Sequence, residues 1–313
     1  MRIGKPAAAL FLVLWGAAGL AAQSNPQQSA ARPSTAAQME TASIYITAST
    51  KKGMLIKDVK PEDLTITEDK APVKIDTVSC NRPEPLLLGI LVDVSGSRRM
   101  DSHLLSHYDE LEAFLEHVLT REDKTYVISF DDRIYKLSEL MSDRVEISPV
   151  FEKLRKHQPA GSTALYDAVK AAAGADFKGR SGHRILVVVG DWKDNSSRVT
   201  SDEALKAAQR TFTTVYAVVD FDAGLEGKIS RKRALDVSRR ITEETGGLAY
   251  IAEEKNDFDK ALQGITGAVL GSCKVTYASP QNPDTTKGVK LHVEANPKGV
   301  SILYPKVRFS STQ

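Results

Sequence analysis

Residues 86–100 read Leu-Leu-Leu-Gly-Ile-Leu-Val-Asp-Val-Ser-Gly-Ser-Arg-Arg-Met, and this stretch decides the fold. Seven apolar or glycine residues run without a polar interruption and end at Asp93. An unbroken apolar run of this length, closed by a polar turn, is typical of a strand buried on both faces of a parallel sheet. We therefore predict a central parallel strand here, with a polar turn at its carboxyl end.

The turn after this strand carries oxygen-bearing side chains on alternate residues, at Asp93, Ser95 and Ser97. In a tight turn, such groups converge on one point above the end of the strand. Carboxylate and hydroxyl oxygens are hard ligands, which suit Mg²⁺, Mn²⁺ or Ca²⁺ better than zinc. Asp, Ser and Gly are also common in any solvent-exposed turn, so this pentapeptide alone leaves a plain turn as the alternative.

Two later stretches carry further oxygen ligands. Residues 160–168 place Thr163 in a loop just before a predicted helix. Residues 185–191 form a second apolar run, which ends at Asp191. Because ligands of such sheets sit at the carboxyl ends of parallel strands, Asp93 and Asp191 are expected at one edge of the sheet.

With these residues in place, the chain resembles the von Willebrand factor type A domain and, more narrowly, a bacterial family of exported proteins that carry it. Five stretches match, over about two thirds of the chain: Leu-Gly-Ile-Leu-Val-Asp-Val-Ser-Gly-Ser at 88–97, Val-Ile-Ser-Phe-Asp-Asp-Arg at 127–133, Gly-Ser-Thr-Ala-Leu-Tyr-Asp-Ala at 161–168, Asp-Asn-Ser-Ser at 194–197 and Glu-Glu-Thr-Gly-Gly at 243–247.

The resemblance implies a metal-ion-dependent adhesion site. Its five positions are occupied by Asp93, Ser95, Ser97, Thr163 and Asp191. By analogy with the family, the three hydroxyls touch a divalent cation, Mg²⁺ or alternatively Mn²⁺ or Ca²⁺, while the two carboxylates act mostly through water. Neutral direct ligands leave the cation electron-poor at its open position. The implied chemistry is capture of an Asp or Glu carboxylate from a partner protein.

Strands and helices alternate between residues 81 and 271, which favours an α/β fold with a doubly wound, mostly parallel sheet of the Rossmann-like type. The predicted strands are residues 86–92, 125–130, 134–137, 185–189, 215–219 and 249–252. The predicted helices are residues 103–119, 145–156, 165–175, 202–209, 234–244 and 258–270.

Both ends of the chain alternate apolar and polar residues, the pattern of half-buried antiparallel strands. Three such strands before residue 80 are too few for a core of their own, and three more after residue 273 can complete it. We predict a small antiparallel β-sandwich into which the metal-site domain is inserted. The predicted segments are a signal peptide (1–22), a flexible leader (23–40), the N-terminal half of the sandwich (41–80), the type A domain (81–271) and the C-terminal half of the sandwich (272–313).

The first 22 residues have a positive start, a short apolar middle and a small-residue cleavage pattern. This is typical of a secretory signal. The Gln-, Ser- and Pro-rich segment that follows is too polar to fold. We expect export to the periplasm or the extracellular space, with no membrane span after cleavage, and an uncleaved membrane anchor is the alternative. Cys80 and Cys273 flank the predicted insertion, so a disulfide between them is expected in that compartment, with two unrelated thiols as the alternative.

Four residues follow the metal motifs directly: Arg98, Arg99, Trp192 and Lys193. As a rim, they would favour an acidic, partly apolar ligand segment, while ordinary solvated charge is the alternative. Trp192 stands where the family more often has glycine, so it could shield the cation or contact the ligand.

A formal net charge of only +2 gives no sign of a nucleic-acid partner, and the oligomeric state cannot be read from the sequence. We expect a non-enzymatic binding protein, with a metal-independent structural protein of the cell envelope as the alternative. A Mg²⁺-dependent phosphatase is less favoured. Asp93 and Gly-Asp-x-x-Asp at 190–194 partly match such enzymes, yet Ser95 replaces the carboxylic acid that would protonate the leaving group. His103, His107 and Glu110 share a helix face and are expected to be surface residues.

Overall fold

The computed structural model describes residues 40–309 apart from 102, 143, 176–179, 222–227, 255 and 281–286. The predicted signal peptide, and all of the predicted leader except Glu40, lie outside these residues. The described residues belong to one compact unit. No helix among them is long and apolar enough to cross a membrane.

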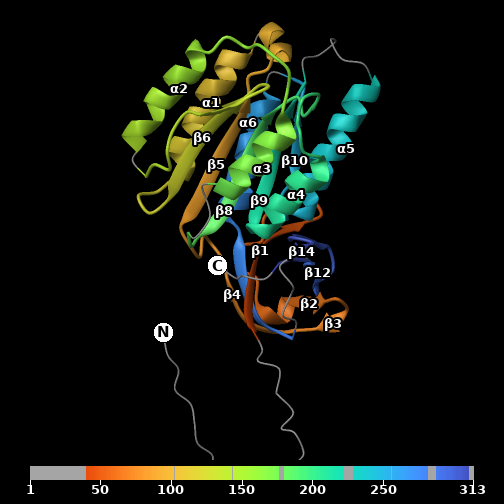
Figure 1. Ribbon diagram of the computed structural model, residues 1–313. Coiled ribbons are helices and arrows are strands. Elements are labelled where there is room, and N and C mark those ends of the chain that lie inside the picture. Colours follow the sequence, from red (N-terminus) through yellow and green to blue (C-terminus); the bar gives the residue numbers. More distant parts are fainter. Residues whose placement is uncertain are drawn as a thin grey trace, which may run out of the picture. The chain divides into compact units, whose positions relative to one another are not determined.

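The central sheet has six strands in the order β10-β9-β8-β5-β6-β7 (Figure 1). All neighbouring strands are parallel except β7, which pairs antiparallel with β6. The strands are β5 (Leu86–Asp93), β6 (Lys124–Phe130), β7 (Ile134–Lys136), β8 (His183–Gly190), β9 (Thr213–Asp220) and β10 (Ala249–Ala252).

Helices cover both faces of this sheet, and the alternation of side chains along β5 shows how. Leu88 and Ile90 pack with α1, α2 and α6, whereas Leu87 and Leu91 pack with α3, α4 and α5. All eight residues of β5 are buried, as the apolar run predicts. The helical segments are η2 (Gly96–Met100), α1 (Leu104–Val118), η3 (Arg144–Glu146), α2 (Ile147–Lys156), α3 (Leu165–Ala175), α4 (Ser201–Arg210), α5 (Lys228–Glu244) and α6 (Asp257–Leu270).

The strand order reverses at β5. The chain passes from β5 through α1 to β6 on one side, and then reaches β8 on the other side of β5. Such a switch opens a crevice at the carboxyl ends of the two strands, where open α/β sheets bind their ligands. β5 ends at Asp93, and β8 ends one residue before Asp191.

The two ends of the chain build two antiparallel sheets, in the orders β13-β1-β11-β4 and β14-β12-β2-β3. Residues of both sheets share one hydrophobic core, so they form a sandwich. Their elements are β1 (Glu40–Thr50), η1 (Pro61–Asp63), β2 (Leu64–Glu68), β3 (Ala71–Pro72), β4 (Lys74–Ser79), β11 (Cys273–Ser279), β12 (Val289–Ala295), β13 (Val300–Leu303) and β14 (Val307–Arg308).

A buried charge network lies inside this sandwich. Glu68, at the end of β2, is fully buried and forms an ion pair with Arg308 of β14 at 2.9 Å. The hydroxyls of Tyr277 and Ser279 on β11 donate to the two carboxylate oxygens at 2.9 and 2.5 Å. Every oxygen of Glu68 therefore has a donor, which a buried charge requires.

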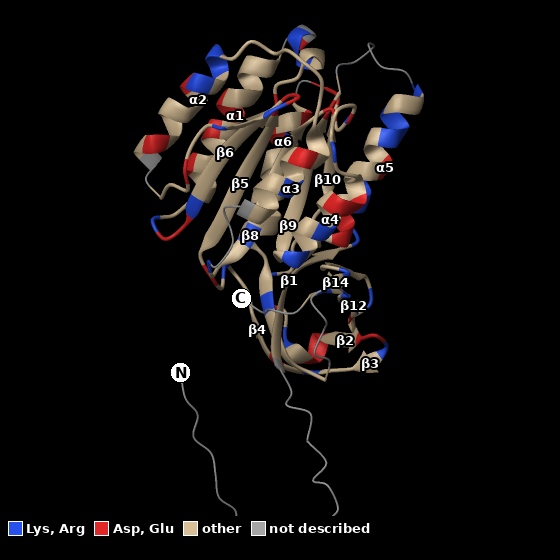
Figure 2. Cartoon of the chain, viewed as in Figure 1, with Lys and Arg blue, Asp and Glu red and all other residues tan. Residues whose placement is uncertain are grey.

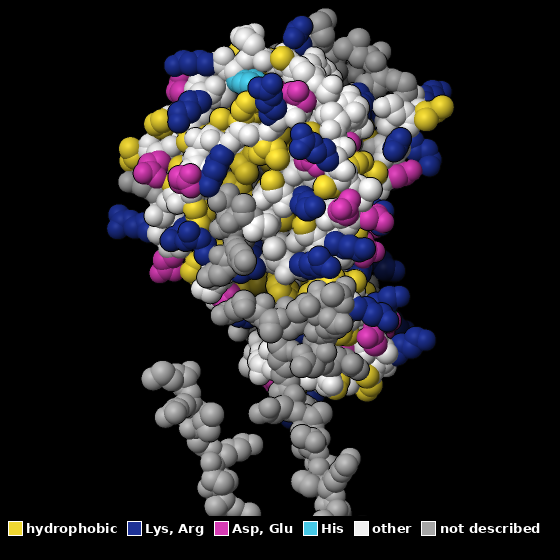
Figure 3. Space-filling model, viewed as in Figure 1, with side chains coloured by type: hydrophobic (Ala, Val, Ile, Leu, Met, Phe, Trp, Pro, Cys, Tyr) yellow, Lys and Arg dark blue, Asp and Glu magenta, His cyan; other side chains and the backbone are white. Residues whose placement is uncertain are grey.

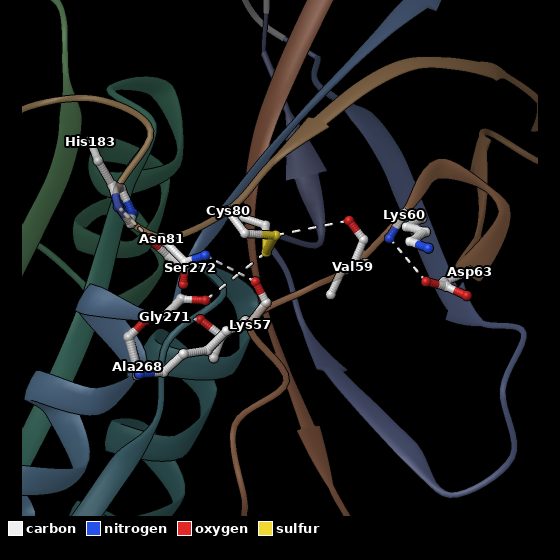
Figure 4. Close-up of a disulfide and its surroundings, with 12 residues drawn as sticks. Lys57, Val59, Lys60, Asp63, Cys80, Asn81, His183, Ala268, Gly271 and Ser272 are labelled. Carbon is white, nitrogen blue, oxygen red and sulfur yellow. Dashed lines mark hydrogen bonds between the residues drawn. A yellow bond between two sulfur atoms is a disulfide. The ribbon is translucent and has the colours of Figure 1, made fainter.

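A disulfide joins Cys80 to Cys273 where the chain enters and leaves the α/β domain (Figure 4). β4 and β11 pair antiparallel as far as Ser79 and Lys274, which brings the two cysteines together. This confirms the predicted bridge. Beside it, the ring of Tyr45 on β1 stacks on His183 of β8, with centroids 3.8 Å apart.

The predicted fold class is confirmed, including the antiparallel sheets from both chain ends. The predicted elements differ from the structure most clearly at α5 and at two short strands, β3 and β13. α5 begins at Lys228 instead of residue 234, because its first turn is exposed and carries no apolar periodicity. Strand β13 was not predicted, since only four residues pair there with β1.

Candidate metal centre

The turn after β5 brings three of the predicted ligands together. The carboxylate of Asp93 accepts a hydrogen bond from the Ser95 N–H through Oδ1, at 2.8 Å. The hydroxyls of Ser95 and Ser97 lie 3.1 Å apart. Asp93 and Ser95 are buried, whereas Ser97 is exposed. The turn thus presents a carboxylate and two hydroxyls, and its outermost ligand faces solvent.

The loop that carries Thr163 is tied to this turn by backbone hydrogen bonds. Gly96 N–H donates to Gly161 C=O, and Ala160 N–H donates to Val94 C=O, both at 3.1 Å. Thr163 itself is buried. Main-chain hydrogen bonds therefore hold the loop that carries the third hydroxyl against the turn after β5.

Asn195 ties the same loop to the turn after β8. Its side-chain Oδ1 accepts from Thr163 N–H at 2.8 Å, and its N–H donates to Thr163 C=O at 3.0 Å. Asp191 lies in this turn and is 3 % exposed. Sequence reasoning did not assign Asn195 a role, although the stretch 194–197 was one of those that matched the family.

Gly190 lets the two acidic turns approach each other. A Cβ at this position would lie 2.5 Å from Cβ of Asp93 and 2.9 Å from its Oδ2. Real Cβ atoms do not approach other atoms this closely, so only glycine fits between β8 and the Asp93 carboxylate. The role of Gly190 was also missed, because close backbone approach leaves no pattern in a single sequence.

The two carboxylates of the centre are compensated to different extents. Burial, and then the charge of Asp191, raise the pKa of Asp93 to about 7. Oδ2 of Asp93 is buried and has no hydrogen-bond partner among the described residues. Asp191 is better compensated, since Nζ of Lys193 lies 3.2 Å from its Oδ2. A buried carboxylate oxygen without a donor is costly unless a cation reaches it.

These groups fit a hard divalent cation. The three turns supply two carboxylates and three hydroxyls, and no sulfur or imidazole belongs to the set. Mg²⁺, Mn²⁺ and Ca²⁺ prefer such oxygen ligands. Asp and Glu also recur in the loops at this end of the sheet, as Figure 2 shows.

Residues 88–193 match the family model of the von Willebrand factor type A domain. The chain contains a type A domain. The matched segment begins inside β5 and ends just beyond Asp191, so it contains all five positions discussed above. No curated protein sequence matches the chain.

Two solved structures that align with a TM-score above 0.5 share this fold. A von Willebrand factor type A protein from Catenulispora acidiphila aligns with a TM-score of 0.52 at 13 % identity, covering 89 % of this chain and 76 % of that one. Proximal thread matrix protein 1 from the mussel byssus aligns with a TM-score of 0.51 at 11 % identity, covering 72 % and 50 %. A structure of that byssus protein with a zinc-occupied metal-ion-dependent adhesion motif aligns with a TM-score of 0.48 at 16 % identity, covering 63 % and 49 %.

The predicted rim of the type A domain needs correction at Arg98. Its side chain is 4 % exposed and turns inward to form ion pairs with Asp101 and Asp220. Burial alone would lower its pKa, but the charges of these carboxylates outweigh that effect and raise it. Arg98 is therefore an interior residue and does not line an exposed rim.

Trp192 also lies inside the type A domain. It is 2 % exposed and packs in the core on the side of α3 and α4. Its backbone has a positive φ of 56°, and its side chain packs among core residues. The predicted place of Trp192 on an exposed, ligand-contacting rim is thus wrong, because the indole is buried. Shielding of the cation by Trp192 stays a prediction.

The other two rim residues lie nearer the surface. Arg99 is exposed and donates to the C=O of Pro159 at 3.1 and 3.2 Å. Lys193 is half-buried beside Asp191. On the face seen in Figure 3, Lys and Arg side chains are scattered among other residues and form no single patch.

A second group of potential ligands lies near the centre. Asp101, His107 and Asp220 place ligand atoms within 4.8 Å of one another, the one such cluster of His, Cys, Asp and Glu found in the described ranges. Arg98 already pairs with both carboxylates, so its guanidinium supplies the positive charge there. We interpret the group as an ion-pair network. The expectation that His107 is a surface residue is wrong, since it is buried and stacks on Phe258 with centroids 4.0 Å apart.

Asp194, the other carboxylate of the phosphatase-like motif, caps the N-terminus of α3. Its Oδ2 accepts from Tyr166 N–H at 3.1 Å and from the hydroxyl of Ser197 at 2.5 Å. Acceptors at this position satisfy the free N–H groups at the start of a helix. The carboxylate is therefore engaged in capping.

Proposed function

We propose that the chain is an exported, metal-dependent protein-binding module. In this proposal a divalent cation, Mg²⁺ or alternatively Mn²⁺ or Ca²⁺, is held at the carboxyl ends of β5 and β8. Ser95, Ser97 and Thr163 provide direct oxygen ligands, while Asp93 and Asp191 supply the negative charge, mostly through water. The open position of the cation binds an Asp or Glu carboxylate of a partner protein.

One observation carries this proposal: the buried Oδ2 of Asp93 has no donor among the described residues. Elsewhere in the chain the buried carboxylate of Glu68 is fully hydrogen-bonded. An acidic oxygen left without a donor, in a crevice at the switch point, is what a cation site requires. The family match over residues 88–193 supports the same assignment.

Two observations favour binding over catalysis. Asp194 is committed to capping α3, so it does not extend the metal ligands in the phosphatase manner. Ser95 donates no proton at neutral pH as a carboxylic acid would, and its N–H is bound to Asp93. We therefore propose a non-enzymatic role.

Export is supported by the disulfide. Cys80 and Cys273 are bonded, and such bonds persist in oxidising compartments outside the cytoplasm. The sequence of residues 1–22 fits a signal peptide, and its removal would leave a periplasmic or extracellular protein. The scattered cations in Figure 3 agree with a protein partner better than with a nucleic acid.

The test is titration calorimetry of residues 23–313 with Mg²⁺ and Mn²⁺, in parallel with Asp93→Ala. We expect saturable binding by the wild-type protein and none by the variant. Asp76→Ala is the matched control, because this exposed carboxylate on β4 lies outside the centre and its loss should change nothing. Trp192 is the one tryptophan in this segment, so its fluorescence gives a second signal from the turn.

Binding of a partner carboxylate to the cation is tested by adding a short Asp-containing peptide to the Mn²⁺-loaded protein and measuring water proton relaxation. A ligand that displaces a water from Mn²⁺ lowers the relaxation enhancement. An unchanged enhancement at millimolar peptide would contradict carboxylate capture. Metal binding without any peptide effect would leave the chain as a metal-stabilised scaffold of the cell envelope.

A further inference from the structure

The buried Arg98 links the proposed metal turn to a distant strand. Arg98 follows Ser97 directly in η2, and its guanidinium reaches Asp220 at the end of β9, two strands away from β5. Nη1 donates to the backbone C=O of Asp220 at 3.1 Å. Nη2 forms ion pairs with the carboxylates of Asp220 and Asp101. The side chain of Arg98 therefore connects η2 to β9, the strand beyond β8 in the sheet.

The same network includes helices α1 and α6. Nδ1 of His107 on α1 lies 3.1 Å from the Asp220 carboxylate, and the His107 ring stacks on Phe258 of α6. Oδ1 of Asp101 accepts from His103 N–H at 2.8 Å, just before α1 begins. The guanidinium thus sits where η2, β9, α1 and α6 meet.

The contacts of Arg98 are strong because they are shielded from water. Burial alone would raise the pKa of Asp220, but the hydrogen bond from His107 and the charge of Arg98 outweigh it and hold that pKa below its usual value. Arg98 and Asp220 are 4 % and 6 % exposed. Charge-assisted hydrogen bonds in such surroundings fix the geometry of the groups that make them.

Ser97, by contrast, has little of its own to hold it. Its side chain is exposed, and the described contacts give it one partner, the Ser95 hydroxyl at 3.1 Å. The main chain of η2 is closed by Arg98 N–H to Ser95 C=O at 3.0 Å and by Asp101 N–H to Arg98 C=O at 3.2 Å. The position of the Ser97 hydroxyl therefore depends on the residue that anchors this turn.

We propose that Arg98 and Asp220 are positioning residues that fix the Ser97 hydroxyl as a cation ligand and so set the affinity of the metal centre without touching the cation. This inference rests on the proposed function, and it names two further residues that set the cation affinity of that same site. Removing a residue that orients a metal ligand without touching the metal commonly weakens metal affinity by 10- to 100-fold.

The experiment compares Mn²⁺ affinity in the wild-type protein, Arg98→Met, Asp220→Asn and the double variant. We expect each single variant to weaken binding by about tenfold, and the double variant to bind no worse than either one. Asp220→Asn keeps the backbone acceptor of Arg98, so it serves as the milder variant if Arg98→Met folds poorly.

Arg308→Met is the matched control. It also removes an arginine from a buried ion pair, with Glu68, but in the sandwich away from the metal turn. A merely structural role for Arg98 would make the two variants alike, because both lower the thermal unfolding temperature. We expect Arg308→Met to bind Mn²⁺ within twofold of the wild-type protein.

Amide hydrogen exchange of the metal-free proteins provides an independent readout. Exchange at the N–H groups of Arg98 and Asp101 should accelerate in Asp220→Asn and stay unchanged in Arg308→Met. Wild-type affinity in both Arg98→Met and Asp220→Asn would overturn this inference alone. Failure of the wild-type protein to bind Mn²⁺ would overturn the metal function together with it, and exchange would then report whether the network still fixes the turn.

Discussion

Two buried carboxylates, in the sandwich and in the candidate metal centre, have different surroundings. In the sandwich, Glu68 receives hydrogen bonds from Arg308, Tyr277 and Ser279. In the metal centre, Asp93 has one oxygen without a donor and a second carboxylate, Asp191, close by. A fold that satisfies one buried charge completely can do so for the other. The difference agrees with a structural role for Glu68 and with the ligand-binding role that we propose for Asp93.

The largest expected effect comes from breaking the satisfied network. Arg308→Met leaves Glu68 buried without its cation, so the free energy of unfolding should fall by about 3–5 kcal/mol. Urea unfolding with EDTA present measures this. Exposed Arg239→Met is the control and should have little effect. A loss below about 1 kcal/mol would mean that the hydroxyls alone hold Glu68.

Removing the unsatisfied charge should have the opposite sign. The pKa of Asp93 is raised from 3.8 to about 7, so the metal-free fold loses stability as the pH rises from about 4 to 7 and carries the full penalty above pH 7. At pH 8 in EDTA, Asp93→Asn should therefore increase the free energy of unfolding by roughly 2–3 kcal/mol. The same urea experiment compares the two regions directly. Destabilisation by Asp93→Asn would show that this carboxylate is structurally satisfied after all.

A third buried ionisable group, His183, makes the free energy of unfolding depend on pH. Burial lowers the pKa of His183 to about 3, against 6.5 for an exposed histidine. The unfolded chain then binds more protons below pH 6.5, so stability falls as the pH drops from there toward 3. Between pH 7 and 5 the loss should be about 2 kcal/mol.

His183→Gln should remove this contribution to the pH dependence, while exposed His117→Gln should keep it. Unfolding free energies at pH 7, 6 and 5 provide the measurement. Equal slopes for both variants would mean that His183 is protonated in the folded protein.

The smallest expected effect probes one bond of the satisfied network. Tyr277→Phe removes a hydroxyl that donates to Glu68 at 2.9 Å, while Arg308 and Ser279 remain. A hydrogen bond to a charged group contributes about 1.5 kcal/mol, so the variant should lose that much stability. Mn²⁺ affinity should stay unchanged. A change in affinity would show that the sandwich and the metal centre are coupled.

Much of the fold could be predicted because its signals are local. The run of residues 86–92 specifies β5, and alternation at both ends of the chain indicates the sandwich strands. α1 and α3 follow their apolar periodicity closely. Four-residue β13 was missed because a strand that short shows too few alternations to separate it from a loop.

The interior of the site was harder to predict. Arg98 and Trp192 follow ligand residues in sequence, and adjacency gave no sign of which way they turn. Trp192 packs in the core with a positive φ. Arg98 turns inward to pair with Asp101, three residues away, and with Asp220, 122 residues away. A local pattern does not reveal the contact with Asp220.

The disulfide gives the chain a particular response to mechanical tension. β1 and β14, the first and last described strands, both belong to the sandwich, and Cys80–Cys273 spans 193 residues. A pull on the two ends passes through the sulfur atoms and bypasses the type A domain. The chain between the two cysteines is a covalently closed loop that carries no tension. Its contour length, roughly 650 Å, therefore does not extend while the disulfide is intact. A partner bound at the metal centre would therefore remain attached to a folded domain while the ends of the chain are under load.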